Sequence, residues 1–410
     1  MAKSKKSSSK SSNTKTKKVV KKVAKKAISK MPLWLIILIV LVVIALGVVV
    51  YLNKDKIANL FNGNRNNITR EYGTDSLVVH YMDVGQGDSI LIELPKENVE
   101  MLIDCGCKGI TKDYETVVLP YLNTYITDGT IEYLVLTHTD EDHVSYLDNV
   151  IEDFQVNNIY MPYILSAPGT SSTPKANAQA KVDALDPVKL AMFKDKDTID
   201  TLVYANFFIN ALSEPNCTIH INADSDKNTT DNVIDGGTYL ITFICPTYAF
   251  YEATSLADAH AKNAVSPVII LEYNGRKLVF TGDSNAYWSN GKLKTTEGNE
   301  WFMVDRIKAL YGNSGIDADV LKIAHHGAEE ASSNEFLDII DCEYGVISCG
   351  AGNGYQHPRA DALNRLKAHN YTIYRTDLNG NIVCIVDAAG NLSFDLAVTK
   401  SQDEEYVPAD

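Results

Sequence analysis

Potential metal ligands are concentrated between His138 and His143, where two imidazoles and three carboxylates fall within six consecutive positions. This run follows the apolar residues 133–136, so it lies at the end of a predicted strand. Imidazole and carboxylate groups are common protein ligands of divalent cations. The alternative is a solvated acidic turn, and the run alone leaves both interpretations open.

Two further clusters of polar side chains follow apolar runs later in the chain. Asp283 follows one such run in the sequence, and the adjacent residues His325 and His326 follow another. Because all three clusters share this strand-end context, we expect them to form one site rather than three independent loops. Five of the nine histidines occupy strand-end or loop positions, namely His138, His143, His325, His326 and His357.

Short β-branched and apolar runs predict two groups of strands that would position these clusters. In the first group we expect strands at 77–82, 89–94, 101–104 and 133–137, with a helix through 117–126. In the second group, Asn274 and Gly275 predict the turn of a hairpin between 267–273 and 277–281. Strands at 319–324, 344–348 and 371–375 then alternate with helices at 334–340 and 359–368, before a final hairpin of 382–387 and 392–396. This pattern predicts an α/β fold in which two sheets pack face to face with helices outside.

Several motifs resemble the metallo-β-lactamase superfamily, and within it the hydrolase domain of ComEC-type DNA-uptake proteins. The matching segments are HYMDVGQGDS at 80–89, LID at 102–104, THTDEDH at 137–143, TGD at 281–283, LKIAHHG at 321–327, QHP at 356–358 and YRTD at 374–377. The resemblance covers about residues 77–387, apart from an apparent insertion at about 166–237. It implies the four-layer αββα sandwich of that superfamily and a hydrolase activity.

The resemblance also implies a set of metal ligands. His138 and Asp140 would bind one divalent ion, Asp142 and His143 would bind a second, and Asp283 would bridge the two. Either His325 or His326 would complete the second position, and the sequence does not choose between them.

Two features depart from the superfamily pattern. Asp140 stands where most members have a histidine, and no plain third-histidine motif precedes Asp283. His260 could fill that place, although a surface histidine is the simpler interpretation. Asn263 and Ser266 match an Asn-x-x-Ser stretch of the ComEC-type domains. A site that is rich in oxygen ligands leaves Zn²⁺ and Mn²⁺ both possible.

A water held between two cations would attack phosphorus or a carbonyl carbon. Asp142 and His143 are the expected catalytic ligands, and Asp142 would also orient this water. Lys322 and His357 are candidates for binding anionic oxygens of the substrate or for protonating the leaving group. The segment 83–88 contains two glycines but lacks a Gly-Lys-Ser/Thr ending. We therefore expect a tight turn whose Asp83 or Asp88 supports the site, rather than a nucleotide-binding loop.

The first part of the chain predicts a membrane anchor. Residues 1–30 contain 12 lysines and no acidic residue, which is typical of a disordered tail. Residues 33–52 carry no charged side chain, so we interpret 31–53 as a single transmembrane helix rather than a cleaved signal peptide. Because lysine-rich flanks stay in the cytoplasm, the rest of the chain is expected outside the cell. It comprises a linker (54–76), the hydrolase domain (77–398) and an acidic C-terminal tail (399–410).

Charge limits the choice of substrate. Outside the tail, 26 basic residues stand against 52 acidic residues, so the domain carries a formal charge of about −26 and should repel a long polyanion. We expect a phosphodiesterase or nuclease acting on DNA or a small phosphodiester at a local positive pocket with Lys322, Arg359 and Arg375. Hydrolysis of an ester, lactone or small phosphoester, and a catalytically silent binding module, are the alternatives. The sequence does not identify a protein partner.

Overall fold

The computed structural model of the chain describes residues 72–109, 111–194, 201–224, 232–253, 259–286 and 299–409. All of these residues belong to one compact unit, Thr69–Asp410. The expected basic tail, the membrane anchor 31–53 and most of the linker 54–76 lie outside the described residues. Within the described ranges, no helix combines the length and the apolar character needed to cross a bilayer.

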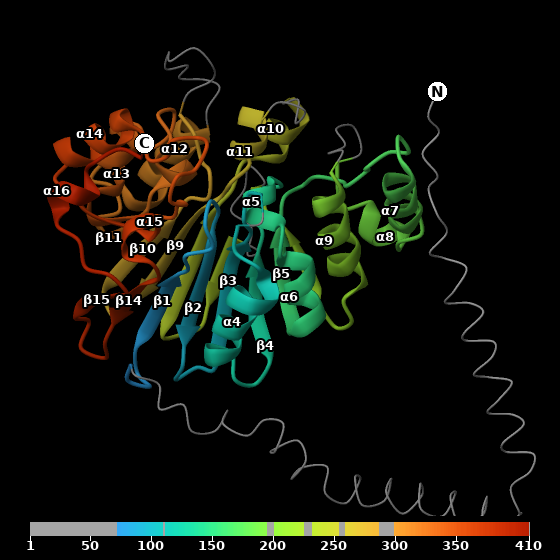
Figure 1. Ribbon diagram of the computed structural model, residues 1–410, viewed down its shortest axis with the longest axis horizontal. Coiled ribbons are helices and arrows are strands. Elements are labelled where there is room, and N and C mark those ends of the chain that lie inside the picture. Colours follow the sequence, from blue (N-terminus) through green and yellow to red (C-terminus); the bar gives the residue numbers. More distant parts are fainter. Residues whose placement is uncertain are drawn as a thin grey trace, which may run out of the picture. The chain divides into compact units, whose positions relative to one another are not determined.

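The first sheet has eight strands in the order β15-β14-β1-β2-β3-β4-β5-β6 (Figure 1). These strands are β1 (Leu77–Tyr81), β2 (Ser89–Leu94), β3 (Val99–Cys105), β4 (Thr130–Val135), β5 (Gln155–Met161), β6 (Thr218–Ile221), β14 (Ile382–Val386) and β15 (Leu392–Leu396). Strands β3 to β6 are parallel, whereas the pairs from β15 to β3 are antiparallel. The parallel strands therefore end at one edge of the sheet.

The second sheet has seven strands in the order β13-β12-β11-β10-β9-β8-β7. They are β7 (Val233–Asp235), β8 (Tyr239–Ile244), β9 (Val268–Tyr273), β10 (Arg276–Phe280), β11 (Ala318–Lys322), β12 (Cys342–Ile347) and β13 (Thr372–Arg375). Strands β10 to β13 are parallel and the remaining pairs are antiparallel. Each half of the domain thus joins an antiparallel part to a parallel part.

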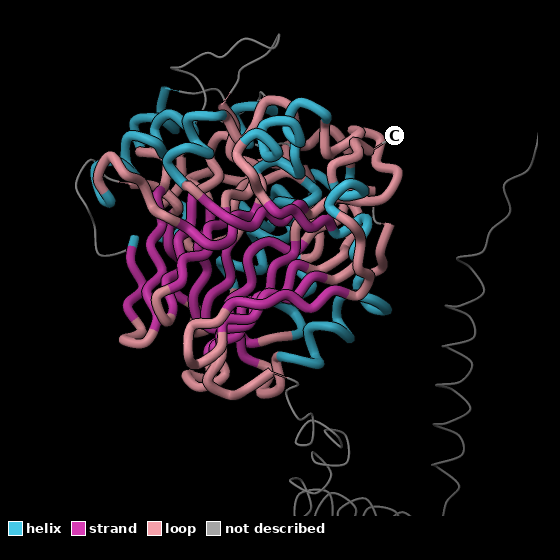
Figure 2. Tube along the Cα trace, turned by 90° about the vertical axis from the view of Figure 1, so that its left-hand side faces the viewer, coloured by secondary structure: helices cyan, strands magenta, loops and turns pink. Residues whose placement is uncertain are grey.

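Helices cover the outer faces of both sheets, while the strands gather in the middle of the domain (Figure 2). The helices of the first half are η2 (Tyr114–Val118), α4 (Leu119–Tyr125), α5 (Glu141–Val144), α6 (Leu147–Asp153), α7 (Thr173–Asp183), α8 (Pro187–Leu190) and α9 (Leu202–Ser213). Those of the second half are α10 (Tyr248–Ala253), α11 (Ala259–Asn263), α12 (Asn299–Tyr311), η4 (Ala324–Gly327), α13 (Asn334–Ile340), α14 (Ala360–Ala368), α15 (Thr376–Asn379) and α16 (Gln402–Glu405). This arrangement is the expected αββα sandwich.

Alternation along the strands builds the central core. In β1, Leu77, Val79 and Tyr81 point between the sheets, because successive side chains of a strand alternate in direction. The ring of Tyr81 lies 6.3 Å from that of Phe280 on the opposite sheet. Two outer cores, one beneath the helices of each half, complete the packing.

The hairpin turn forms as expected, since Asn274 and Gly275 both have positive φ, at 47° and 79°. The segment 166–237, which we expected to be an insertion, contributes more than surface structure. Its helix α9 buries Phe207 and Phe208 in the core of the first half, and its strand β6 extends the first sheet. Helix α16, in the expected acidic tail, buries Glu405 against the domain.

Candidate metal centre

The predicted ligands meet at one edge of the sandwich. Strand β4 leads to His138 and then to helix α5, which carries Asp142 and His143. Strand β10 leads to Asp283, and β11 leads to η4 with its two histidines. Loops from both sheets therefore supply the site, which explains why its parts are far apart in the sequence.

Glycines allow the surrounding loops to approach the ligand backbone. A Cβ atom added to Gly106 would lie 2.5 Å from the Asp142 carbonyl carbon and from the His143 amide nitrogen. A Cβ atom on Gly87 would lie 2.3 Å from the Gly106 carbonyl oxygen, and Gly87 has a φ of +154°. The Asp88 amide also donates a hydrogen bond to the Asp142 carbonyl at 3.0 Å. The tight turn expected at 83–88 thus supports helix α5.

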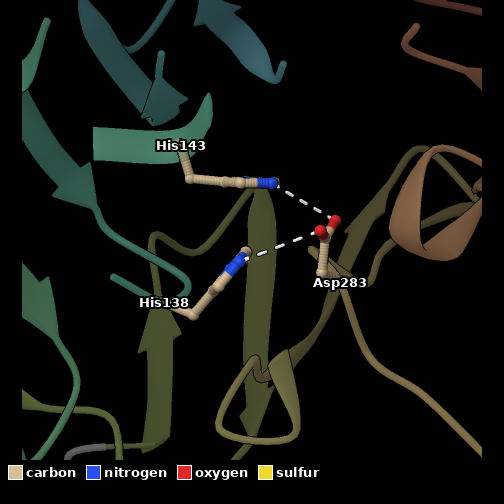
Figure 3. A group of neighbouring side chains, drawn as sticks. All are labelled: His138, His143 and Asp283. Atoms are coloured by element: carbon tan, nitrogen blue, oxygen red, sulfur yellow. Dashed lines mark ion pairs between the residues drawn. The ribbon is translucent and has the colours of Figure 1, made fainter. Parts of the chain in front are cut away.

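One group of ligand atoms comprises His138, His143 and Asp283 (Figure 3). The Nε2 atom of His143 lies 3.3 Å from one Asp283 oxygen, and the Nε2 atom of His138 lies 3.8 Å from the other. All three side chains are buried. Both carboxylate oxygens of Asp283 therefore face imidazole nitrogens from the opposite sheet.

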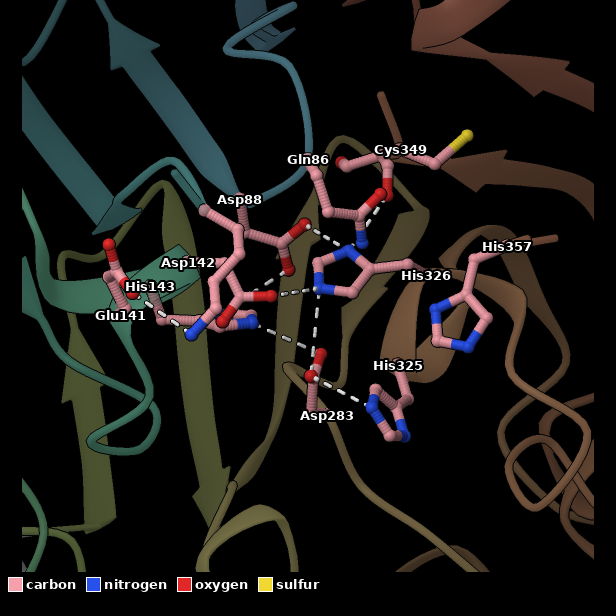
Figure 4. Close-up of polar contacts among 12 residues, drawn as sticks. Gln86, Asp88, Glu141, Asp142, His143, Asp283, His325, His326, Cys349 and His357 are labelled. Atoms are coloured by element: carbon pink, nitrogen blue, oxygen red, sulfur yellow. Dashed lines mark hydrogen bonds and ion pairs between the residues drawn. The ribbon is translucent and has the colours of Figure 1, made fainter. Parts of the chain in front are cut away.

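A second group comprises Asp142, His143 and His326 (Figure 4). The Nε2 atom of His326 lies 3.5 Å from Asp142 and 3.6 Å from Asp283. Asp283 thus contacts members of both groups, which is the position required of a bridging ligand.

Outer partners fix the orientation of the histidine rings. The Nδ1 atom of His143 lies 2.8 Å from Asp104, which also accepts hydrogen bonds from the Thr137 amide and hydroxyl. The Nδ1 atom of His326 lies 2.8 Å from the Ser348 carbonyl oxygen. An Nδ1–H donated to these oxygens leaves the Nε2 lone pair for a metal, as in most histidine-ligated sites.

The ligand atoms that face the centre have no hydrogen-bond partner among the described residues. They are the Nε2 atoms of His138, His143 and His326 and the Oδ1 atom of Asp283. A buried polar atom without a partner is costly, and native proteins rarely keep several together. Divalent cations would satisfy all of these atoms, so the residues present fit a metal centre.

The electrostatics keep the carboxylates in their metal-binding form. Burial alone would raise the pKa of Asp142, but nearby His326 and His143 outweigh it and lower that pKa below the usual range. The same balance with His143, His326 and His325 holds the pKa of Asp283 well below its ordinary value. Burial and His143 together lower the pKa of His138 to about 4. Ionised carboxylates and neutral imidazoles bind metal, so a bound cation would displace the proton on His143, whose pKa Asp283 and Asp104 raise well above its ordinary value despite burial.

The two adjacent histidines of η4 differ in their surroundings, although both have positive φ, at 48° and 54°. The ring of His326 is buried and belongs to two of the ligand groups. The ring of His325 lies closer to the surface, with Nδ1 at 3.0 Å from Glu330 and Nε2 at 3.6 Å from Asp283. The geometry therefore favours His326 as the ligand.

Asp140 and His260 are not brought into the ligand groups of the described residues. The carboxylate of Asp140 forms an ion pair with Lys262 of helix α11. His260 lines the cavity above the centre, and its carbonyl oxygen accepts a hydrogen bond from Asn285. The Asn-x-x-Ser stretch does reach the site, because the Ser266 hydroxyl lies 3.3 Å from His138 Nδ1 and accepts a hydrogen bond from the Asp283 amide.

Lys322 lies beneath the site rather than in the cavity. Its side chain is fully buried, and its ammonium lies 2.8 Å from Asp88. The other oxygen of Asp88 lies 3.5 Å from His326 Nδ1. Lys322 therefore supports the histidines through Asp88, and its ammonium does not reach a substrate.

The cavity above the centre has a volume of about 390 Å³. His357 lines it, with its ring 5.4 Å from the ring of His325. Burial and the neighbouring His326 and His325 lower the pKa of His357 to about 3. The ring faces the cavity, where a neutral imidazole can donate or accept a hydrogen bond with a substrate.

Several cavity residues escaped the sequence prediction. Lys108 and Lys262 supply the ammonium groups, Glu330 contacts His325, and Tyr355 presents an exposed ring. Single lysines and tyrosines in loops carry no motif, so only the folded chain identifies them.

Comparisons with known proteins agree with this geometry. Residues 82–207 match the family described as the Metallo-beta-lactamase superfamily. The chain is 24% identical to ComE operon protein 3 of Bacillus subtilis (strain 168) over 319 residues, which cover 74% of this chain and 32% of that protein. It is 34% identical to competence protein ComA of Neisseria gonorrhoeae over 118 residues, covering 29% of this chain and 15% of that protein. The chain thus spans about a third or less of these relatives.

Among solved structures, the metallo-beta-lactamase fold protein YhfI from Bacillus subtilis matches with 12% identity and a TM-score of 0.38, covering 78% of this chain and 100% of that chain. The sequence matches and the ligand-bearing αββα sandwich lead to one conclusion. The chain is related to the metallo-β-lactamase superfamily through residues 82–207, and it resembles the ComEC-type competence proteins.

Proposed function

We propose that this chain is a membrane-anchored, metal-dependent phosphodiesterase or nuclease that uses two divalent ions, either Zn²⁺ or Mn²⁺. The observation that carries the proposal is the set of buried ligand atoms around Asp283 that come from both sheets and have no hydrogen-bond partner among the described residues. Cations bound there would supply a water deprotonated near neutral pH. The chain's own residues hold the ligands in place and leave an open cavity above them.

The distribution of charge in the cavity supports a small anionic segment as substrate. The ammonium groups of Lys108 and Lys262 line the cavity. Lys322, Arg359 and Arg375, which we expected to form a positive pocket, are not among the residues that line this cavity. Arg375 is 2% exposed and holds both oxygens of Asp377. Bound cations and two lysines would offset the acidic surface locally, while the rest of the domain still repels long duplexes.

Hydrolysis of a small ester, lactone or phosphoester remains the second candidate, because the same activated water attacks carbonyl carbon and phosphorus. The third candidate, a silent binding module, gives no role to the ligand atoms of His138, His143, His326 and Asp283 that have no hydrogen-bond partner among the described residues. A single experiment separates all three. The full-length chain, loaded with Mn²⁺ or Zn²⁺, is assayed on methyl p-nitrophenyl phosphate, single-stranded DNA, a carboxylic ester and a lactone.

We expect slow metal-dependent cleavage of both phosphodiesters, and we expect the double variant D142A/H143A to abolish it. Asp283→Ala should lower metal content at both positions, which native mass spectrometry measures directly. Rapid turnover of the lactone or ester without any phosphodiester cleavage would replace the nuclease proposal by the second candidate. Metal binding without any turnover would favour the third.

The proposed topology places the domain outside the cytoplasm, because the 12 lysines of residues 1–30 precede the apolar segment. Protease added to intact cells should digest the chain beyond residue 53 and spare the lysine-rich tail. A domain that stays protected until the cells are broken would reverse this orientation.

A further inference from the structure

A second cavity of about 340 Å³ lies beside the metal cavity and shares three lining residues with it, namely Gln86, Lys108 and Tyr355. None of the ligand residues of the metal groups lines it. Its walls come from the loop after β1, the segment after β3 and the glycine-rich loop 350–354. The two cavities therefore adjoin, and together they are called the groove here, with the metal centre in one half.

Tyr355 stands at the junction of the two halves. Its side chain is 46% exposed, which is unusual for a large aromatic residue in this domain. Its ring stacks on His357, with centroids 5.7 Å apart and planes at 26°. His357 in turn stacks on His326, at 6.3 Å and 23°. The stacked rings of His326, His357 and Tyr355 therefore connect the metal centre to an aromatic face that is open to the groove.

The loop that carries this ring is held in place. The Asn353 side-chain amide donates hydrogen bonds to the carbonyl oxygens of Gly350 at 2.9 Å and His357 at 2.6 Å. Its carbonyl oxygen accepts from the His357 amide at 3.0 Å. Gly352 and Gly354 have no atoms within 4 Å of an added Cβ, so this wall of the groove is bare backbone beside open space. The tyrosine is therefore presented on a fixed support.

Two ammonium groups line the second cavity. Lys108 pairs with Glu141 at 2.9 Å and Lys112 pairs with Asp83 at 3.0 Å, and both lysines are partly exposed. Exposed ion pairs contribute little free energy, so either lysine can turn to a phosphate at small cost. The other carboxylate of this cavity, Asp377, is already neutralised by Arg375. An anionic ligand in this cavity can therefore replace the carboxylate partners of these two lysines.

We propose that this second half of the groove is a binding subsite for single-stranded nucleic acid, next to the metal centre. A base would stack on the open face of Tyr355, and the adjoining phosphates would contact Lys108 and Lys112. Aromatic stacking combined with lysines along a groove is how proteins hold single strands without reading their sequence. This inference rests on the proposed phosphodiesterase function and assigns its substrate to a strand rather than a small diester.

The kinetic test compares the full-length chain with Tyr355→Ala on two substrates. Stacking contributes about 1–3 kcal/mol per base, so KM for a short single-stranded oligonucleotide should rise about ten-fold. The KM for methyl p-nitrophenyl phosphate, whose single nitrophenyl ring offers less stacking than a run of bases, should rise much less than that for the oligonucleotide. Tyr355→Phe should retain oligonucleotide binding, and Tyr248→Ala removes an exposed tyrosine elsewhere as the matched control. Equal effects on both substrates, or none on either, would overturn the subsite.

The lysines are tested in the same way. The double variant K108Q/K112Q should raise the oligonucleotide KM and flatten its dependence on salt. Lys96→Gln, which removes a lysine paired with Asp75 at 3.3 Å, is the control. An unchanged salt dependence in K108Q/K112Q would exclude these lysines from the subsite.

A crosslinking readout is independent of turnover. An oligonucleotide carrying 5-iodouracil is irradiated with the metal-loaded chain, and the modified peptides are mapped by mass spectrometry. We expect an adduct on Tyr355, which Tyr355→Ala removes. Adducts confined to other segments, including the lysine-rich residues 1–30, would refute the subsite. Failure of the parent to cleave either substrate would count against the proposed function alone, since the crosslink still decides this inference.

Discussion

Asp104 Oδ2 lies 2.8 Å from His143 Nδ1, so this buried carboxylate fixes which nitrogen of the His143 ring faces the metal centre. Asp104 is itself held by the amide and hydroxyl of Thr137 at 2.8 and 2.7 Å. The ligand geometry of His143 therefore depends on a residue from strand β3 that does not belong to the 138–143 segment.

The first prediction concerns this pair. Asp104→Asn keeps the shape of the side chain but removes its charge, and its amide group must face either His143 or Thr137. We expect metal affinity to fall about 10- to 100-fold, the usual cost of losing an outer partner. Metal titration of the full-length chain measures this, with Asp338→Asn as an exposed control. Equal affinities in both variants would contradict the role of Asp104.

The adjacent histidines provide a matched pair. His326→Ala should reduce metal affinity by more than about 100-fold, because a direct ligand outweighs an outer partner. His325→Ala should cost much less, since this ring contacts Glu330 and lies nearer the surface. Both residues have positive φ, so backbone strain in the two variants is similar. Metal content by native mass spectrometry decides between them, and a greater loss in His325→Ala would reverse the assignment.

Close packing beneath helix α5 leads to a third prediction. Gly106→Ala places a methyl group 2.5 Å from the backbone of Asp142 and His143, and that backbone carries two ligands. We expect a loss of about 1–3 kcal/mol in the free energy of unfolding, as for overpacked cores, together with reduced metal binding. Gly354→Ala meets open space and should change neither quantity. Urea unfolding measures the difference, and a fully stable Gly106→Ala would show that the loop can shift.

The fourth prediction concerns pH. Burial raises the pKa of Glu300 to about 7, even though hydrogen bonds from Ser333 and Ser332 favour its ionised form. A carboxyl whose folded pKa is raised stabilises the fold below its unfolded pKa, and this stability is lost as pH rises through the folded pKa. The domain should therefore lose up to about 3 kcal/mol of stability between about pH 4.5 and 7 from this group.

Urea unfolding at pH 5 and pH 8 tests this prediction in the parent and in Glu300→Gln. The amide cannot titrate and loses a hydrogen bond to the serines, so the variant should be less stable but less sensitive to pH. Asp224 and Glu405, whose pKa values burial also raises to about 6 and about 7, titrate in both proteins and cancel in the comparison. Identical pH slopes would contradict the assignment to Glu300.

The sequence by itself determined the elements and the types of ligand. Short β-branched and apolar runs predicted the strands that lead to His138 and Asp283, because a buried strand needs a continuous apolar segment. The Asn274-Gly275 pair predicted its hairpin, since positive φ at both positions favours those residues. These features depend on interactions between neighbours in the chain, which a sequence displays directly.

Only the tertiary structure determines which of the candidate residues face the metal centre and which support it from behind. Whether His325 or His326 faces the metals depends on strained backbone at the end of β11, and whether Lys322 reaches the cavity depends on Asp88 from another sheet. Helix α9 belongs to the outer core of the first half because its apolar side packs beside helices α5, α6 and α7, although its surroundings in sequence are polar. These contacts depend on side chains that are far apart in the sequence, so no local sequence pattern can predict them.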